Sequence, residues 1–352
     1  MHLNASPAAF GRALLLVGAL FAAACSTDST APAGDGPELG RGGAQGPDFR
    51  AANAAKDKHV EGLMEQDGVE GVGVTLTARG EPAVAIFTTH GAVGGLPRAL
   101  DGVPVELMIT GKIEAILPRA KPGGGGANPR DEFAFPVPIG VSIGNASECA
   151  AGTLGARVTR GGAQYVLSNN HVLARQNAAS PGEDILQPGR YDTACNATGS
   201  VIADLSDFVE IRFGNQNNTV DAAIAQIRAG AVGNGTHGGG YGVPDSDPVV
   251  ATIGMSVQKC GRTTNCNTGT VSSINATVNV QYSGGVARFV NQVVISGNRG
   301  AFSRSGDSGS LIVTNNAAAN PVALLFAGSN TVTIGNRIQD VLQALSITID
   351  GN

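Results

Sequence analysis

From residue 137 to the end of the chain, short apolar runs alternate with turns rich in glycine and asparagine. The runs have the length of strands, as in Leu311–Val313, and the turns at 160–163 and 283–285 are typical of hairpins. Only 337–344 has the spacing of a helix. We therefore predict a mainly β domain over residues 137–352.

The part of the chain before this domain has a different pattern. Apolar residues first recur at helical spacing, and strand-like runs then follow. The expected elements are a helix at 50–66, strands at 72–76, 83–87 and 103–109, and a short helix at 96–100. We predict a small α+β domain over 49–118 that carries no chemistry. It could be a pro-region that assists folding or inhibits, or a spacer or binding module.

A glycine-rich stretch separates the two parts. Lys121–Pro129 contains a run of glycines flanked by prolines, so we predict a linker over 119–136.

The first residues resemble a secretory leader. The apolar run Ala13–Ala24 is too short to span a membrane. Small residues lead up to Cys25, as in bacterial lipoproteins, although ordinary signal cleavage near this point also fits. We predict a signal peptide over 1–25 with Cys25 lipidated, and a flexible tether over 26–48. The protein is then exported, either anchored to the cell envelope or secreted.

The composition supports an exported β protein. Charged residues are 14%, against roughly 25% in typical soluble domains. The chain has 51 glycines and no tryptophan. Its formal net charge is −5 without a basic cluster, so we expect no nucleic-acid partner.

Four cysteines, Cys149, Cys195, Cys260 and Cys266, lie in the β domain. An even number in an exported domain predicts disulfides, and three pairings are possible. Cys260 and Cys266 would close a short loop, which leaves Cys149 to pair with Cys195. A zinc site is the alternative, but there is no Cys-x-x-Cys and His237 is the only spare imidazole nearby. We expect no metal and no cofactor.

The segment Ser305–Ser310 contains a serine between glycine-rich neighbours, directly before an apolar strand. A tight turn of this kind exposes the hydroxyl of Ser308 and can aim backbone N–H groups at one point beside it. Gly-Asp-Ser-Gly could also be an ordinary turn.

A nucleophilic serine needs a base, and the chain has five histidines. Four are poorly placed: His2 in the leader, His59 and His90 in the α+β part, and His237 in a glycine-rich loop. His171 follows the strand-like run 164–168, whose rigid end would hold an imidazole well.

The base in turn needs a carboxylate on its other nitrogen. Asp221 precedes an almost wholly apolar run, which would bury it and so require a charged or hydrogen-bonding partner. Asp204 and Asp207 are rivals, but a solvated strand edge or turn suits them better. The predicted catalytic residues are His171, Asp221 and Ser308, in that chain order.

These motifs resemble those of the bacterial trypsin-like serine peptidases, with streptogrisin-like features near 259–271. The matching segments are Ser168–Leu173, Val220–Ile224, Lys259–Thr264 with Gly269–Val271, and Gly306–Ser310. The resemblance implies a double antiparallel β-barrel of the chymotrypsin type. His171 and Asp221 would come from the first barrel and Ser308 from the second. It also implies an oxyanion hole made by the N–H groups of Gly306 and Ser308. Ser310 stands where many relatives have glycine, and Val172 stands where animal relatives often have cysteine.

The resemblance also suggests a specificity pocket. It would be formed by Phe302 at its base and by Ala327, Gly328 and Ser329 along its wall. These residues bring no charge, so we expect a neutral, apolar preference. Asp307 should be buried and paired, with Arg262 or Arg304 as its partner.

The sequence therefore predicts a monomeric exported serine endopeptidase that acts on polypeptides through an acyl-enzyme. Membrane attachment would occur only through Cys25. Two other functions stay open: an inactive binding module on the same fold, and an esterase.

Overall fold

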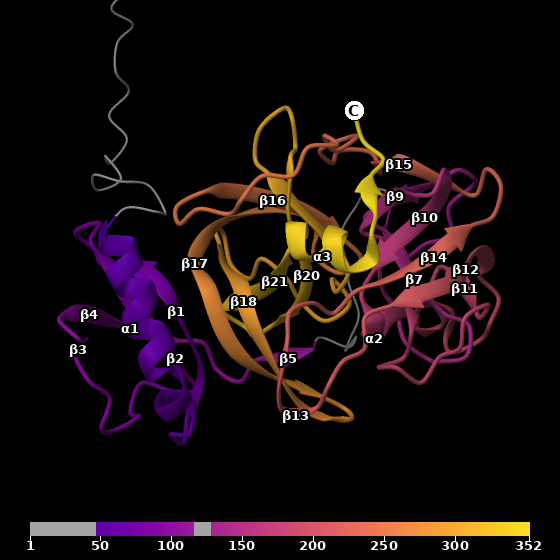
Figure 1. The fold of residues 1–352 in the computed structure, drawn as a ribbon. Helices are drawn as coiled ribbons and strands as arrows, with labels where there is room; N and C mark the ends of the chain where they lie inside the picture. Colours follow the sequence, from indigo (N-terminus) through magenta and orange to yellow (C-terminus); the bar gives the residue numbers. More distant parts are fainter. Residues whose placement is uncertain (1–46, 116–127) are drawn as a thin grey trace, which may run out of the picture. The chain divides into compact units, whose positions relative to one another are not determined.

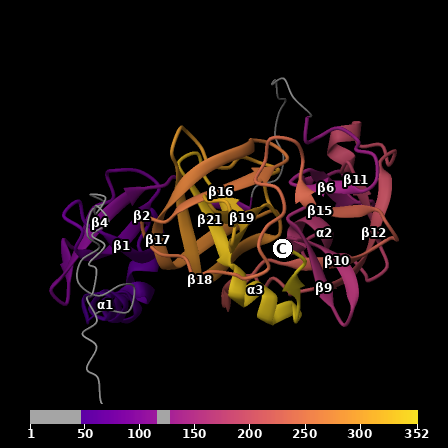
Figure 2. The same cartoon turned by 90° about the horizontal axis from the view of Figure 1, so that it is seen from above.

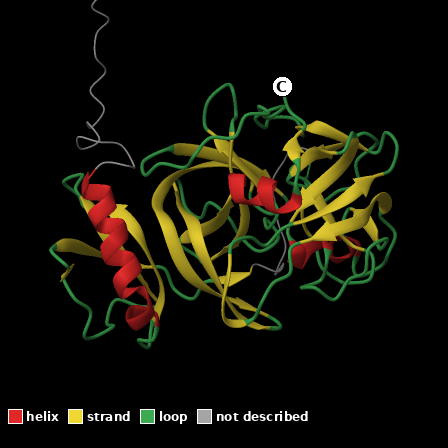
Figure 3. Cartoon of the chain, viewed as in Figure 1, coloured by secondary structure: helices red, strands yellow, loops and turns green. Residues whose placement is uncertain are grey.

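The computed structural model describes residues 47–115 and 128–352. The predicted signal peptide, Cys25, most of the predicted tether and half of the predicted linker lie outside these residues. Within the described ranges, no helix is long and apolar enough to cross a membrane. Strands and loops make up most of the molecule (Figure 3).

Six antiparallel strands in the C-terminal part close into a barrel (Figure 1). They pair in the order β16, β17, β18, β21, β20 and β19, and β19 pairs with β16 again. Their bounds are β16 Ser256–Gly261, β17 Asn265–Tyr282, β18 Gly285–Gly297, β19 Leu311–Thr314, β20 Pro321–Gly328 and β21 Val332–Arg337. Short β13 (Gly214–Asn218) adds to β18 in parallel, and helix α3 (Ile338–Leu345) follows β21.

A second sheet of eight strands has the order β22, β9, β10, β14, β12, β11, β7, β8. Their bounds are β7 Ser142–Asn145, β8 Gly152–Thr153, β9 Ala156–Arg160, β10 Ala163–Ser168, β11 Asp184–Gln187, β12 Ser200–Phe208, β14 Ala223–Ile227 and β22 Thr348–Ile349. Helix α2 (Asn170–Leu173) and a 3₁₀ turn η1 (Arg190–Thr193) lie in its loops, and β6 (Val137–Ile139) pairs with β15 (Val232–Thr236) beside it. In Figures 1 and 2 these strands form a group separate from the barrel.

One apolar cluster joins the two sheets. Leu167 and Ile224 of the eight-stranded sheet share it with Leu311 and Leu324 of the barrel, and all four are fully buried. Burial of this apolar surface holds the end of β10 close to the start of β19. The predicted base, His171, follows β10, and the predicted nucleophile, Ser308, precedes β19. The predicted site therefore lies at the interface between the two sheets.

The N-terminal part contains α1 (Pro47–Met64), β1 (Val69–Leu76), β2 (Pro82–Thr88), β3 (Ala99–Leu100), β4 (Val103–Ile109) and β5 (Glu114–Ala115). The short helix predicted at 96–100 is wrong, because Ala99–Leu100 forms a strand that pairs with β4. Helix α1 packs on β1 and β2 through Ala55, Val60 and Leu63.

This α+β part is not a separate sheet. β1 pairs antiparallel with β17, so the N-terminal strands extend the sheet of the barrel to twelve strands. β5 pairs with both β17 and β20. The two parts that the sequence suggested are therefore joined by backbone hydrogen bonds.

Both predicted disulfides are present, Cys149–Cys195 and Cys260–Cys266. The second joins directly opposed residues of β16 and β17. The cysteines therefore do not form a zinc site.

Candidate active site

His171 lies in α2, directly after β10, and its side chain is buried. The turn that carries it is fixed to the neighbouring strand, because Asn169 donates a side-chain hydrogen bond to the carbonyl of Asp221 at 2.7 Å. The sequence position predicted for the base therefore has the rigid support that a base needs.

Asp221 is fully buried immediately before β14 and faces His171. Its Oδ2 lies 2.5 Å from Nδ1 of His171, and its Oδ1 accepts the His171 backbone N–H at 3.2 Å. The backbone N–H of Asp221 donates to Asn336 of the barrel at 2.9 Å. A carboxylate held in this way fixes the orientation of the imidazole and stabilises its protonated form.

The rival aspartates do not reach His171. Asp204 and Asp207 lie on β12 with exposed side chains, and they pair with Arg228 and Arg160 respectively. The hydrogen bond from Arg228 holds the pKa of Asp204 below its usual value. These two carboxylates form ion pairs at the surface, as expected for a solvated strand.

The turn that carries Ser308 depends on two glycines with left-handed backbone, Gly306 at φ +94° and Gly309 at φ +93°. A Cβ on Gly309 would lie 2.1 Å from Oγ of Ser168, so only glycine fits after the serine. The Ser308 carbonyl accepts a hydrogen bond from the Thr153 N–H of β8 at 2.8 Å. The serine turn is thus bonded directly to the sheet that carries His171.

The backbone of Ser308 and the residue after His171 meet at Gly152. A Cβ there would lie 2.4 Å from Val172 and 2.9 Å from the Ser308 carbonyl. Oγ of Ser308 donates to the Phe326 carbonyl at 3.3 Å. Nε2 of His171 is buried and makes no hydrogen bond to any described residue. The serine turn and the segment that follows His171 thus meet at Gly152, but no hydrogen bond joins Ser308 Oγ to His171 Nε2 in this conformation.

Asp307 is fully buried and well satisfied beside the nucleophile. Its carboxylate accepts backbone hydrogen bonds from Thr263, Thr264 and Arg304 at 2.8–3.1 Å. Its cationic partner is Lys259 at 3.7 Å, and burial lowers the pKa of that lysine. The predicted partners Arg262 and Arg304 are therefore wrong as side-chain partners.

Arg262 instead forms a buried pair with Asp192, with two contacts of 2.5 and 2.7 Å. It lies against the serine turn, since a Cβ on Gly306 would be 2.3 Å from Nη1 of Arg262. The Gly306 N–H makes no hydrogen bond to any described residue. The oxyanion hole formed by Gly306 and Ser308 stays a prediction.

Three of the predicted pocket residues lie at or just after the end of β20, which is hydrogen-bonded to the serine turn through Leu325 and Gly309. Ala327 and Gly328 end β20, and Ser329 follows them. Phe302 is 2% exposed and packs in the barrel core, with Lys259 Nζ 5.9 Å from its ring centre. The role of these four residues in substrate binding stays a prediction.

Tyr282, at the end of β17, is a site residue that sequence reasoning missed. Its hydroxyl donates to Oδ2 of Asp221 at 2.8 Å, and its ring meets that of His171 edge-on with 5.9 Å between centres. Burial, followed by the charge of Asp221, raises the pKa of Tyr282 well above its usual value, so the hydroxyl stays a donor. No motif marks this tyrosine, because it comes from the opposite sheet and meets Asp221 only after folding.

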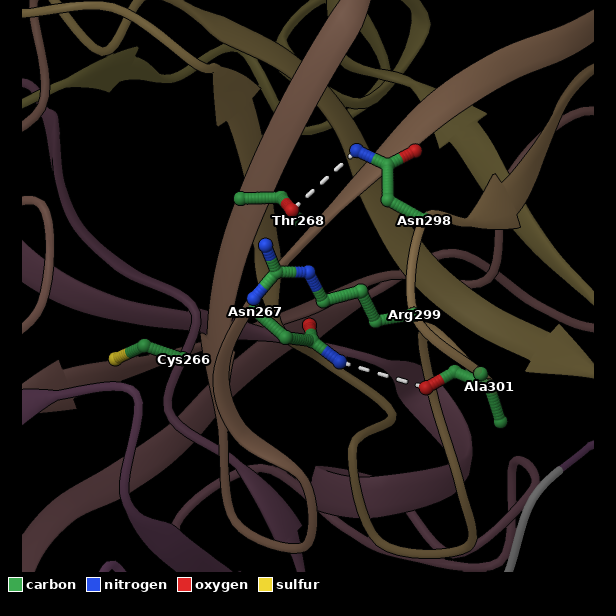
Figure 4. A pocket seen from close by; sticks show the side chains of 7 residues that line it. Cys266, Asn267, Thr268, Asn298, Arg299 and Ala301 are labelled. Carbon is green, nitrogen blue, oxygen red and sulfur yellow. Dashed lines mark hydrogen bonds between the residues drawn. The ribbon is translucent and has the colours of Figure 1, made fainter.

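A polar cavity of about 600 Å³ lies elsewhere on the barrel (Figure 4). Its walls come from the start of β17 and from the loop after β18, and Asn298 donates to Thr268 at 3.3 Å across it. None of the three predicted catalytic residues lines it. Among the described residues no group of three His, Cys, Asp or Glu side chains could hold a metal.

Comparison with known families finds a match to the Nal1 C-terminal domain over residues 137–339, which is more than half of the chain. No curated protein matches the sequence.

Several solved structures are similar. A glutamic acid-specific serine protease is 22% identical, with a TM-score of 0.43, over 60% of this chain and 100% of its own. Thermobifida fusca protease A is 17% identical, with a TM-score of 0.44, over 61% and 98%. Cellulomonas bogoriensis chymotrypsin is 18% identical, with a TM-score of 0.41, over 61% and 99%.

The closed six-stranded barrel and the second antiparallel sheet define the fold. The mainly β fold that the sequence predicted is confirmed.

Proposed function

The chain belongs to the family of the Nal1 C-terminal domain, and on that premise we propose that it is a serine endopeptidase with His171, Asp221 and Ser308 as its catalytic residues. The family name specifies no reaction, so the proposal rests on the site. The observation that carries it is the buried pair of Asp221 and His171, which leaves Nε2 without a partner beside the serine turn.

The chemistry follows from these positions. Nε2 of His171 takes the proton of Ser308 as Oγ attacks the carbonyl carbon of a peptide bond. The resulting oxyanion is stabilised by the N–H groups of Gly306 and Ser308. His171 then donates the proton to the leaving amine as the C–N bond breaks, which leaves an acyl-enzyme. Water, deprotonated by His171, hydrolyses this ester and restores Ser308.

Ser308→Ala tests the proposal. Turnover of peptides should fall by several orders of magnitude, and labelling by a fluorophosphonate should disappear, while the circular dichroism spectrum stays unchanged. Ser305→Ala, on the same turn, is the matched control and should keep both activities. A Ser308→Ala variant that cleaves peptides normally would disprove the assignment. Absence of labelling in every form of the protein would favour an inactive binding module, and turnover of simple esters alone would favour an esterase.

We also propose that the protein works outside the cytoplasm, held at the cell envelope through Cys25. The two disulfides support this, because such bonds persist in oxidising compartments. With lipid on Cys25, the tether would let the protease domain reach substrates away from the membrane surface.

A further inference from the structure

The strand beside the nucleophile has one edge that the barrel does not complete. β21 pairs along most of one edge of β20, whereas β19 covers only the first half of the other edge. The remainder of that second edge is paired with β5, with Ala115 opposite Ala327 and Glu114 opposite Gly328. A segment of the N-terminal part, β5, therefore fills a gap in the barrel sheet beside β20 (Figure 1).

The register fixes the direction of this segment. β5 is antiparallel to β20, so the chain approaches Phe326 as it passes from Glu114 to Ala115. Phe326 is the residue whose carbonyl accepts the hydrogen bond from Ser308 Oγ. An extended peptide binds an open sheet edge by adding a strand, and main-chain hydrogen bonds supply much of its affinity. β5 occupies the edge that such a peptide would need.

Ile113 anchors the segment. Its side chain is 1% exposed and packs in the same apolar cluster as Phe326 and Ala327. Its carbonyl accepts the Gln281 N–H at 3.0 Å, and its N–H donates to Glu70 at 3.4 Å. The segment is thus held by β17 and β1 as well as by β20.

The nucleophile itself is inaccessible. Ser308 has no exposed surface, and His171 has 1%. No substrate reaches the hydroxyl in this conformation, which agrees with an occupied edge.

Resting on the proposed function, we propose that residues 113–115 are an internal ligand of the peptide-binding edge of β20. They lower the activity of the protein toward extended peptides until they are released. The partner of this surface is the chain's own segment, and the competing ligand is any extended peptide that can pair with Ala327 and Gly328.

Ile113→Asp tests this in the full-length protein, because a carboxylate cannot stay in the apolar cluster. Ile109→Asp is the matched control, since Ile109 is 56% exposed in the same part of the chain. Hydrogen exchange measures whether β5 is released from the edge of β20, and it does so independently of catalysis. Amides at 113–115 and 326–328 should exchange at least about tenfold faster in Ile113→Asp than in the wild type. Hydrolysis of a fluorogenic peptide library should rise by a similar factor, about 10- to 100-fold.

A peptide with the sequence of residues 109–115, added to the Ile113→Asp variant, should restore the inhibition. If Ile113→Asp does not fold, replacement of both Glu114 and Ala115 by proline serves the same purpose, because it removes strand N–H groups and keeps the anchor.

Rapid exchange at 113–115 in the wild type, or equal peptide hydrolysis by wild type and a released variant, would overturn the inference. Released amides without any hydrolysis or fluorophosphonate labelling would instead overturn the proposed function. The two failures are therefore distinguishable.

Discussion

Tyr282→Phe removes a single oxygen atom from the buried site, and its consequences can be worked out from the contacts. Asp221 Oδ2 accepts two hydrogen bonds, from His171 Nδ1 at 2.5 Å and from the Tyr282 hydroxyl at 2.8 Å. The variant keeps the first and loses the second. The phenyl ring preserves the packing against His171 and Phe213.

The magnitude follows from the charge of the acceptor. A hydrogen bond to a charged, buried group contributes about 1.5–3 kcal/mol. For a domain of this size that corresponds to a fall in Tm of about 3–12 °C. For catalysis, complete loss of the orienting carboxylate costs about 10⁴ in kcat, which sets an upper limit. Because the carboxylate and its bond to His171 remain, we expect kcat to fall about 10- to 100-fold.

The assay is peptide hydrolysis with kcat and KM measured separately, using an Ile113→Asp background if the wild type is inactive. KM should stay unchanged, because Tyr282 holds Asp221 and is not a predicted substrate-binding residue. Tyr241→Phe is the matched control, since Tyr241 packs against the core of the eight-stranded sheet. An unchanged kcat in Tyr282→Phe, or an equal loss in Tyr241→Phe, would refute the reasoning.

Three further predictions use the same structure. Asp221→Asn should lower kcat by about 10⁴ at neutral pH, while Asp204→Asn and Asp207→Asn keep near-normal rates; a reversed ranking would show that the acid is misplaced. Burial lowers the pKa of His237, so as the pH falls below about 6.5 the unfolded chain takes up protons that the folded chain does not, and stability falls. The Tm of His237→Gln should therefore fall less than that of the wild type between about pH 7.5 and pH 5, as measured by calorimetry; an equal fall would contradict this. Cys25→Ser should move the protein from the membrane fraction to the soluble fraction without changing its peptidase activity; a wild-type protein that is already soluble would contradict the lipid anchor.

The candidate site residues were predicted from features that are local in the sequence. Ser308 lies between glycines whose left-handed backbone the turn requires, and His171 follows a strand that the apolar pattern marks. Asp221 could be chosen over Asp204 because its following residues are apolar and a buried carboxylate needs a partner. Each of these inferences uses only neighbours in the chain.

The contacts that the sequence did not predict are between residues far apart in the chain. Lys259 pairs with Asp307 because β16 and the serine turn pack together, whereas the two arginines looked equally suitable by charge alone. The strand at Ala99–Leu100 is too short to have its own pattern and exists only because β4 offers it a partner. Pairing between β1 and β17 likewise joins two strands that are far apart in the chain.

The pairing of β1 with β17 attaches the N-terminal part to the barrel, whereas the proposed inhibition comes from the pairing of β5 with β20. β1 meets β17 at three residue pairs, and Glu61 of the same N-terminal part pairs with Arg288 at 2.8 Å, whereas β5 meets β20 at two residue pairs and β17 at one. The contacts of β5 are separate from those of β1, so they can open while the N-terminal strands stay on the barrel. Release of Ile113–Ala115 would then expose the edge of β20 without removing the N-terminal part. On this reasoning, only the local release of residues 113–115 is needed to activate the site. An extended peptide with higher affinity for the same edge of β20 can itself displace them.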